Sequence, residues 1–134
     1  MSEDMPQFGI VTWIDLTVKD AESIRDFYSA VVGWDHSPVS MGSYNDYSML
    51  PENSEFPIAG VCHARGVNAN LPAQWLIYIT VEDLDESIAA CKKLGGKVLV
   101  GPKTMSDTAR YCVIKDPAGA VTALYEELTE SETD

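Results

Sequence analysis

The first regular pattern of hydrophobic and polar positions lies in residues 13–33. Ile14, Leu16 and Val18 alternate with polar or mixed residues, which is the two-residue period of a half-buried strand. After residue 20 the period lengthens, and the apolar residues that recur three and four positions apart are Ile24, Phe27, Tyr28 and Val31. This spacing predicts one apolar stripe on a helix. We expect the stripe to pack on the apolar face of the strand.

Capping residues mark the ends of this helix and of a second helix later in the chain. Asp20 predicts the N-cap of the first helix, and Gly33 predicts its C-terminal end. In the second helix, Asp83 and Glu86 have the spacing of a capping box, and the glycines at 95–96 end it. The stripe of the second helix consists of Ile88, Cys91 and Leu94.

Each helix belongs to a repeated order of elements: strand, helix, strand, strand, strand. The predicted strands of the first half are residues 13–18, 34–39, 44–50 and 58–63. Those of the second half are residues 75–81, 97–100, 110–115 and 120–126, with a break at Gly101 and Pro102. The repeat predicts a single α+β domain of residues 1–134, built from module 8–63 and module 74–127 and joined by loop 64–73.

Composition adds to this picture by excluding several kinds of partner. The chain has 21 acidic residues against nine Lys and Arg, and its formal net charge is −12. Phosphate backbones and anionic lipid surfaces repel such a protein, so we expect neither nucleic acid nor membrane as a partner. The three cysteines include no CxxC pair, and we find neither a hydrophobic leader nor an apolar run of about 20 residues. We therefore expect a reduced, cytoplasmic protein.

Short motifs carry a resemblance to a known family. A Val-x-Asp turn at residues 18–20 leads into the helix that bears Phe27 and Tyr28, Val-Gly-Trp follows at 32–34, and a DPAG turn at 116–119 precedes the last strand. With these motifs and the repeated βαβββ order, the chain resembles the vicinal oxygen chelate superfamily, which includes glyoxalase I, bleomycin-resistance proteins and extradiol dioxygenases. The resemblance covers nearly the whole chain. It implies a curved mixed sheet around a cup, with the helices outside.

The resemblance also implies where a metal would be bound. In metal-dependent members of the family, His and Glu side chains on inward strand positions hold a divalent ion that binds neighbouring substrate oxygens. These positions correspond here to Trp13, Leu76 and Ala123, and a fourth lies near residues 60–62, where no carboxylate occurs. Such side chains do not coordinate divalent ions. We therefore predict no metal and no other cofactor, with a rebuilt metal site around Asp15 as the alternative.

The cup is expected to have an apolar and aromatic lining with few polar groups, which is typical of a small-molecule site. Strand parity turns these candidate ligand-binding residues inward: Trp13, Asp15, Leu76, Tyr78, Ala123 and Tyr125. Asp15 is the most informative of them, because a carboxylate on an aromatic face can act as a general base if its pKa is raised. The alternative is a carboxylate that is hydrogen-bonded to a neighbouring strand or to solvent.

Other polar and aromatic residues are further candidates. Tyr44 and Tyr47 form an aromatic rim of the cup or, alternatively, serve hairpin formation and strand packing. His63 is a candidate general acid or base; alternatively, its ring contacts solvent or the acidic surface nearby. Cys62 is a candidate nucleophile only if a base lies beside it. Arg110 is a candidate partner for an anionic ligand group or, alternatively, for one of the chain's many acids.

These observations predict a glyoxalase/bleomycin-resistance-like protein that binds a small organic molecule in the cup between its modules, without the family's metal. The alternative is a glyoxalase-like lyase, isomerase or dioxygenase that acts on a small oxygenated metabolite, with Asp15 as its base. Because pairing of chains would protect open sheet edges, we also predict a homodimer. The sequence leaves open whether the cup forms within one chain or across two.

Overall fold

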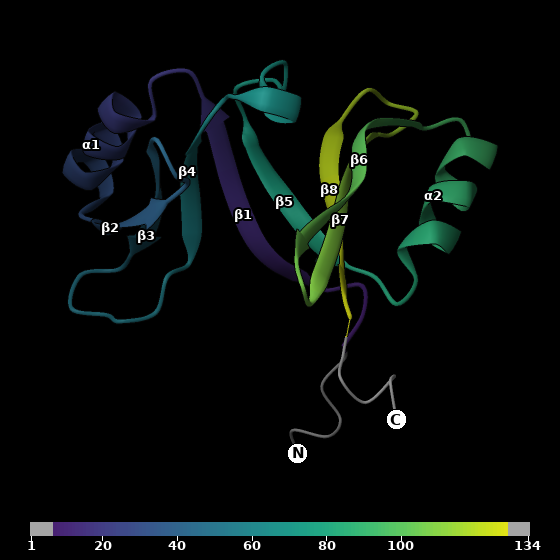
Figure 1. Cartoon of the computed structure of the whole chain (residues 1–134), viewed down its shortest axis with the longest axis horizontal. Coiled ribbons are helices and arrows are strands. Elements are labelled where there is room, and N and C mark those ends of the chain that lie inside the picture. The colour runs from purple at the N-terminus through teal and green to yellow at the C-terminus, as the bar shows by residue number, and fades with distance from the viewer. Residues whose placement is uncertain (1–6, 129–134) are drawn as a thin grey trace. The chain divides into compact units, whose positions relative to one another are not determined.

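The elements of the chain follow the predicted order in a computed structural model, which describes residues 7–128 (Figure 1). The first series comprises β1 (Val11–Val18), α1 (Ala21–Val32), β2 (Asp35–Ser40), β3 (Asn45–Leu50) and β4 (Ala59–His63), followed by the short 3-10 helix η2 (Gly66–Asn68). The second series comprises β5 (Trp75–Thr80), α2 (Leu84–Lys93), β6 (Lys97–Ser106), β7 (Ala109–Lys115) and β8 (Val121–Glu127). The βαβββ order therefore occurs twice, and the predicted α+β fold is confirmed.

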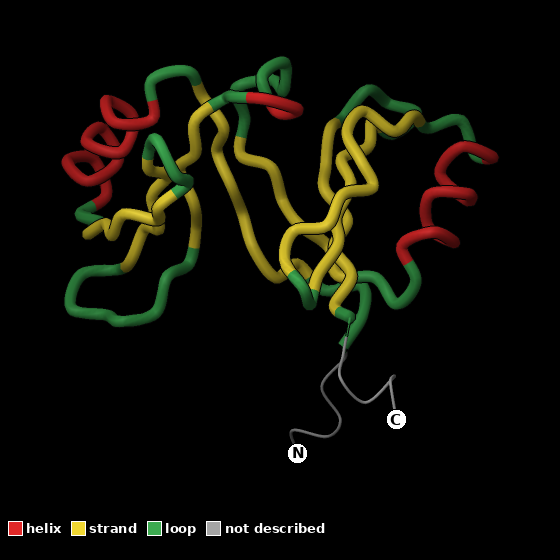
Figure 2. The backbone as a smooth tube through the Cα atoms, viewed as in Figure 1, coloured by secondary structure: helices red, strands yellow, loops and turns green. Residues whose placement is uncertain are grey.

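The described residues form two compact units. Residues 13–76 make up the N-terminal unit, and residues 7–12 together with 77–128 make up the C-terminal unit. The first residues of β1 belong to the C-terminal unit, where the hydroxyl groups of Thr12 and Thr80 lie 3.0 Å apart. Each unit has its own helix and its own strands (Figure 2). Each also has its own hydrophobic core.

The N-terminal unit has the strand order β2-β3-β4-β1, in which β1 and β4 are parallel and the other pairs are antiparallel. Helix α1 packs against β2, β3 and β4. It begins as predicted at Asp20, whose carboxylate accepts a hydrogen bond of 3.1 Å from the Ser23 amide, and it ends at Gly33, which has a φ of 80°. The core beneath the helix consists of Ala21, Tyr47, Met49, Ala59 and Val61.

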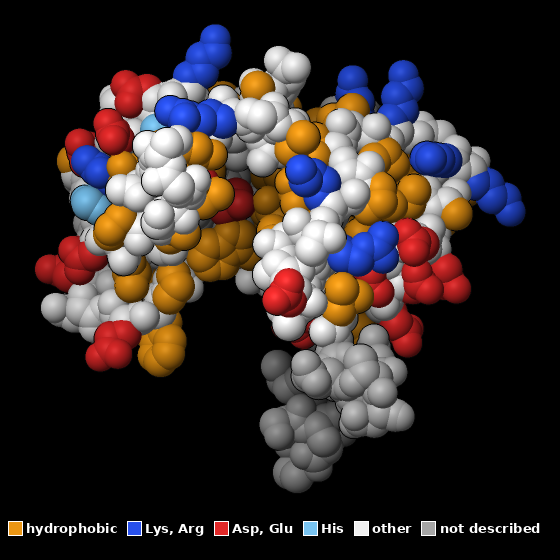
Figure 3. Space-filling model, in the orientation of Figure 1, with side chains coloured by type: hydrophobic (Ala, Val, Ile, Leu, Met, Phe, Trp, Pro, Cys, Tyr) orange, Lys and Arg blue, Asp and Glu red, His pale blue; other side chains and the backbone are white. Residues whose placement is uncertain are grey.

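The C-terminal unit has the strand order β5-β8-β7-β6, with β5 and β8 parallel. The predicted N-cap of α2 is confirmed, because the Asp83 carboxylate accepts a hydrogen bond of 3.1 Å from the Glu86 amide. Acidic side chains gather at the first turn of α2 and lysines at its last turn (Figure 3), as the helix dipole favours. The core of this unit consists of Leu84, Ile88, Cys112 and Leu124.

The structure differs from the sequence prediction at the apolar stripe of α1. Ile24 and Tyr28 pack against the core, whereas Phe27 and Val31 remain 53% and 60% exposed. The reason is that α1 packs over β2, β3 and β4, so that part of its stripe does not reach a neighbouring strand. None of the helices in residues 7–128 is long and apolar enough to cross a membrane.

A second difference concerns the predicted break at Gly101 and Pro102. Strand β6 continues through both residues to Ser106, with shifts of register between Val100 and Lys103. An edge strand tolerates proline because one side of its backbone needs no partner within the sheet, and an irregular register absorbs the missing N–H. The break predicted from Gly-Pro was therefore wrong.

Candidate ligand-binding site

Asp15 occupies the middle of β1, on the sheet face opposite to α1. The indole Nε1 of Trp13, two residues earlier on the same face, donates a hydrogen bond of 2.5 Å to Asp15 Oδ1. Across the sheet, Asp15 stands in register with Gly60 on β4. A Cβ atom at position 60 would overlap the Asp15 carboxylate, so the absence of a side chain there makes room for that group.

A partly buried thiol and a second carboxylate lie near Asp15. Cys62 is aligned with Thr17 of β1 and therefore shares the sheet face of Asp15. Burial raises the pKa of the Cys62 thiol, and the negative charges of Asp15 and Asp46 raise it further. The thiol is therefore protonated at neutral pH, which disfavours Cys62 as a nucleophile. The same electrostatic effect indicates that this face attracts positive charge.

His63 and Tyr44 lie together at the end of β4. The His63 amide donates a hydrogen bond of 2.9 Å to Asp46 Oδ1, and the His63 ring Nδ1 is 3.4 Å from the same oxygen. The Tyr44 ring meets the His63 ring edge-on, with centroids 5.4 Å apart, and Arg65 Cζ lies 3.9 Å from the Tyr44 centroid. Asp46 therefore orients His63, while Tyr44 makes a cation–π contact with an arginine of its own chain.

Tyr47 lies on the other face of the sheet, beneath α1. It is 5% exposed and belongs to the hydrophobic core of the N-terminal unit. Its hydroxyl donates a hydrogen bond of 3.2 Å to Glu22 Oε2, and Arg25 Cζ lies 4.6 Å from its ring centroid. Burial raises the pKa of Tyr47, and the Glu22 charge adds to this effect. The placement fits strand packing, one of the two predicted alternatives, and does not fit a ligand-binding rim.

The remaining inward candidates lie on the strands that follow. Leu76 is 5% exposed and ends the N-terminal unit. In the C-terminal unit, Tyr78 is in register with Ala123, and Thr80 with Tyr125. These residues lie on the face opposite to the core under α2, which agrees with the predicted strand parity. Burial raises the pKa of Tyr125, with a further contribution from Glu127.

Arg110 lies on the α2 side of its sheet, away from Tyr78. Its guanidinium donates hydrogen bonds of 3.0 Å to Asp85 Oδ1 and 3.2 Å to Glu126 Oε1. The hydrogen bond with Asp85 is the main cause of its raised pKa. The structure therefore places Arg110 in ion pairs with acids of its own chain, which was the predicted alternative to a ligand contact.

The sequence analysis considered residues 60–62 only as the position of a fourth metal ligand and did not identify Gly60 as the neighbour that makes room for Asp15. The position of this glycine within the predicted strand 58–63 was a usable signal, because glycine inside a strand often marks close approach of another group. Asp46 was also missed, since only the alignment of β3 with β4 places it near Cys62 and His63. The candidate site of the N-terminal unit thus centres on Asp15, Trp13 and Gly60, with Cys62 and Asp46 beside them.

Comparison with known proteins decides the family. The model of the Glyoxalase/Bleomycin resistance protein/Dioxygenase superfamily matches residues 10–124. The chain belongs to this superfamily. The resemblance predicted from the sequence motifs is therefore confirmed.

Two curated relatives of this superfamily member have about twice its length. The "Putative glyoxylase CFP32" of Mycobacterium tuberculosis is 32% identical over 120 residues, which are 88% of this chain and 46% of the relative. The anthracycline biosynthesis protein DnrV of Streptomyces peucetius is 25% identical over 130 residues, which are 89% of this chain and 47% of the relative. The chain thus spans about half the length of the curated relatives it matches.

Solved structures with low sequence identity share the superfamily fold. Methylmalonyl-CoA epimerase in complex with methylmalonyl-CoA and NH4+ has a TM-score of 0.57 and 17% identity, over 90% of this chain and 96% of that chain. A variant of homoprotocatechuate 2,3-dioxygenase from B. fuscum has a TM-score of 0.59 and 17% identity, over 92% of this chain and 34% of that chain. At such identities the likeness extends to the fold alone.

The metal that the superfamily implies can be compared with the side chains present. The three corresponding positions hold Trp13, Leu76 and Ala123, whose side chains offer a divalent ion no oxygen, sulfur or imidazole ligand. Within residues 7–128, no group of three or more His, Cys, Asp and Glu side chains is arranged to hold an ion. The side chains of the described part of the chain do not fit such a metal.

Proposed function

We propose that this superfamily member binds a small organic cation with an aromatic or apolar body at the Asp15 face, without a bound metal ion. The observation that carries the proposal is the Asp15 carboxylate, which is half-buried, bonded to the Trp13 indole and seated in the room left by the missing side chain of Gly60. A half-buried carboxylate beside an aromatic ring offers a cation both an ion pair and a cation–π contact.

The electrostatics of the face and the family names support a cationic ligand. Asp15 and Asp46 both disfavour an additional negative charge at Cys62, so the same field stabilises a positive one. The superfamily is named in part for bleomycin resistance, and one relative is an anthracycline biosynthesis protein. An anthracycline combines a flat aromatic body with an amino sugar that is cationic at neutral pH, so it is a suitable probe.

The test is titration of the purified chain with doxorubicin, an anthracycline, followed by its fluorescence and by calorimetry. The Asp15→Asn variant removes one charge and is expected to weaken binding roughly tenfold or more, because hydrogen bonds and ion pairs to charged groups contribute about 1.5–3 kcal/mol. Asp26→Asn is the charge-matched control, since Asp26 is 63% exposed on α1 and should leave affinity within about twofold. Equal affinities of the wild type and Asp15→Asn would contradict the proposal.

Elemental analysis separates this proposal from glyoxalase-like chemistry with a rebuilt metal site. We expect the chain as purified to lack stoichiometric Zn, Ni, Fe or Mn and to bind doxorubicin equally well after treatment with a chelator. A stoichiometric metal that is lost in Asp15→Ala would contradict the metal-free binder. It would favour the alternative of a lyase, isomerase or dioxygenase.

We also propose that the chain pairs with a second copy in the cytoplasm. Strands β2 and β6 are the edges of their sheets, and all residues of β2 are exposed, so pairing would protect strand backbone. The doubled length of the curated relatives supports an assembly of two such chains. All three cysteines are free thiols, which supports a reducing compartment. A monomer mass in light scattering at micromolar concentration would contradict pairing.

A further inference from the structure

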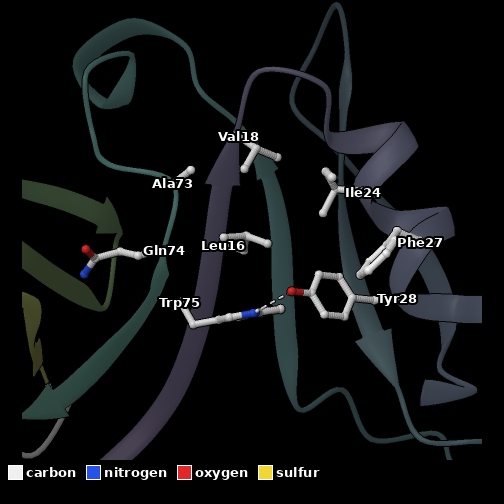
Figure 4. Close-up of a pocket in the computed structure, with 8 residues that line it drawn as sticks. All are labelled: Leu16, Val18, Ile24, Phe27, Tyr28, Ala73, Gln74 and Trp75. Atoms are coloured by element: carbon white, nitrogen blue, oxygen red, sulfur yellow. Dashed lines mark hydrogen bonds between the residues drawn. The ribbon is translucent and has the colours of Figure 1, made fainter. Parts of the chain in front are cut away.

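A hollow lies in the N-terminal unit, on the sheet face opposite to Asp15. It has a volume of about 310 Å³ and lies between α1, β1 and the start of β5 (Figure 4). The side chains that define this α1–β1 hollow are Leu16, Val18, Ile24, Phe27, Tyr28 and Trp75. It arises because α1 packs over β2, β3 and β4, which leaves the apolar face of β1 incompletely covered.

The lining of the hollow is mostly apolar and aromatic, with Gln74 at its edge and one hydroxyl group, that of Tyr28, among the rings. The Trp75 ring meets the Tyr28 ring edge-on, with centroids 5.2 Å apart, and Trp75 Nε1 donates a hydrogen bond of 3.1 Å to the Tyr28 hydroxyl. In Figure 4 this hydroxyl lies among the lining side chains and points toward the Trp75 indole. Because the oxygen accepts from Trp75, its own hydrogen remains to be donated, and no acceptor for it occurs among the described residues.

We propose that the α1–β1 hollow binds a flat apolar molecule that carries one hydrogen-bond acceptor, such as an aromatic ketone. The rings of Phe27, Tyr28 and Trp75 would contact the flat body, and the Tyr28 hydroxyl would donate to the acceptor. An apolar cavity of about 150 Å³ is sufficient for benzene, so the larger volume here suits a molecule of two fused rings. This site lies on a different sheet face from Asp15 and does not depend on the proposed function.

Two tryptophans provide reporters for the two sheet faces. The indole N–H of Trp75 borders the hollow, whereas that of Trp13 is bonded to Asp15 on the opposite face. The experiment is titration of the ¹⁵N-labelled full chain with 2-acetylnaphthalene, with the indole resonances assigned by Trp→Phe variants. We expect the Trp75 indole resonance to shift in a saturable manner and the Trp13 resonance to stay unchanged.

Variants and a second probe test the geometry. Tyr28→Phe should weaken binding of 2-acetylnaphthalene roughly three- to tenfold, because it removes one neutral hydrogen bond. The same variant should not change binding of 2-ethylnaphthalene, because this probe lacks the hydrogen-bond acceptor. Ala73→Leu places a larger side chain at an exposed position that lines the hollow, so it should reduce affinity at least fivefold without disturbing the core. Ala69→Leu, also exposed in the same loop but outside the lining, is the matched control and should bind like the wild type.

Three results would overturn the proposal. They are no shift of the Trp75 resonance up to the solubility limit of the probe, a shift of Trp13 in place of Trp75, and an affinity that Ala73→Leu leaves unchanged. Since Ala73 is exposed, its variant remains informative if Tyr28→Phe fails to fold. Failure of doxorubicin binding at Asp15 would leave these outcomes unaffected, so the two proposals are tested separately.

Discussion

Replacing Gly60 with alanine tests whether the Asp15 carboxylate is held where the structure places it. The added Cβ would overlap the Asp15 carboxylate and stand 3.5 Å from Trp13 Cζ2. The carboxylate must then rotate away and lose its hydrogen bond from the Trp13 indole. We expect Gly60→Ala to destabilise the protein and to weaken binding of a cation at this face.

The size of the effect follows from two opposing contributions. A hydrogen bond to a charged group contributes about 1.5–3 kcal/mol, and the partly buried Trp13–Asp15 bond is of this kind. Alanine is favoured over glycine within a regular element by about 0.5–1 kcal/mol, because glycine loses more conformational entropy on folding. The net loss in the free energy of unfolding is therefore about 1–2 kcal/mol.

A double-mutant cycle with Asp15→Ala isolates the interaction. Once the carboxylate is absent, both sub-van-der-Waals neighbours of a Cβ at position 60 are gone, and Trp13 Cζ2 remains at 3.5 Å, an ordinary contact distance. Gly60→Ala should therefore be neutral or stabilising by about 0.5–1 kcal/mol in that background. Urea denaturation followed by tryptophan fluorescence measures all four proteins. The reasoning is refuted if Gly60→Ala costs the same free energy with and without Asp15, or if it stabilises the wild type.

Three further predictions concern the C-terminal unit. Asp83→Ala removes the N-cap of α2 and should lower the free energy of unfolding by about 1 kcal/mol in urea titrations. Asp83→Asn keeps a capping side chain and should therefore retain most of the wild-type stability. Arg110→Met should lower the free energy of unfolding by about 0.5–1 kcal/mol, and by less in 1 M NaCl, because Asp85 is 71% exposed and salt screens the ion pair. Arg110 lies on the α2 side of its sheet, so the variant should bind doxorubicin with unchanged affinity. Burial raises the pKa of Cys112 from 9.0 to about 11, so the unfolded chain releases this proton first as pH rises. The contribution of this thiol to stability is therefore fully present below pH 9 and is lost as the pH rises from about 9 to 11. We expect the free energy of unfolding to fall by about 1 kcal/mol by pH 10, a loss that Cys112→Ala should reduce.

Local features of the fold were predictable because they depend on neighbouring residues. The N-caps at Asp20 and Asp83 and the helix end at Gly33 follow from short-range hydrogen bonding and from backbone conformation, so they can be predicted without knowledge of the tertiary structure. Strand parity also correctly separated Tyr78 from the core of its unit. These signals require no information about which strands become neighbours.

The candidate site was less predictable because its residues depend on strand register. Tyr47 lies beneath α1 because β3 aligns it with Val61 of β4, and its sequence neighbours carry no sign of this pairing. Arg110 forms ion pairs with Glu126 of β8 and Asp85 of α2. The sequence contains many other carboxylates, so it did not identify these two as the partners. A glycine inside a strand indicates the close approach of some group, but only the register of β1 with β4 identifies that group as the Asp15 carboxylate.

The register of β1 against β4 links the two proposed sites. Asp15 stands beside Gly60, and the next residue on each strand, Leu16 and Val61, forms a pair on the opposite face. On the face of the carboxylate the neighbouring residue is a glycine, whose missing side chain leaves room for that carboxylate, while the other face has a branched apolar side chain. Each strand therefore complements the alternation of the other. A slip of one residue would place a carboxylate in the core beneath α1, which costs several kcal/mol. The alternation that makes the unit stable thus also assigns the two proposed ligands, a cation and a flat apolar molecule, to opposite faces of β1.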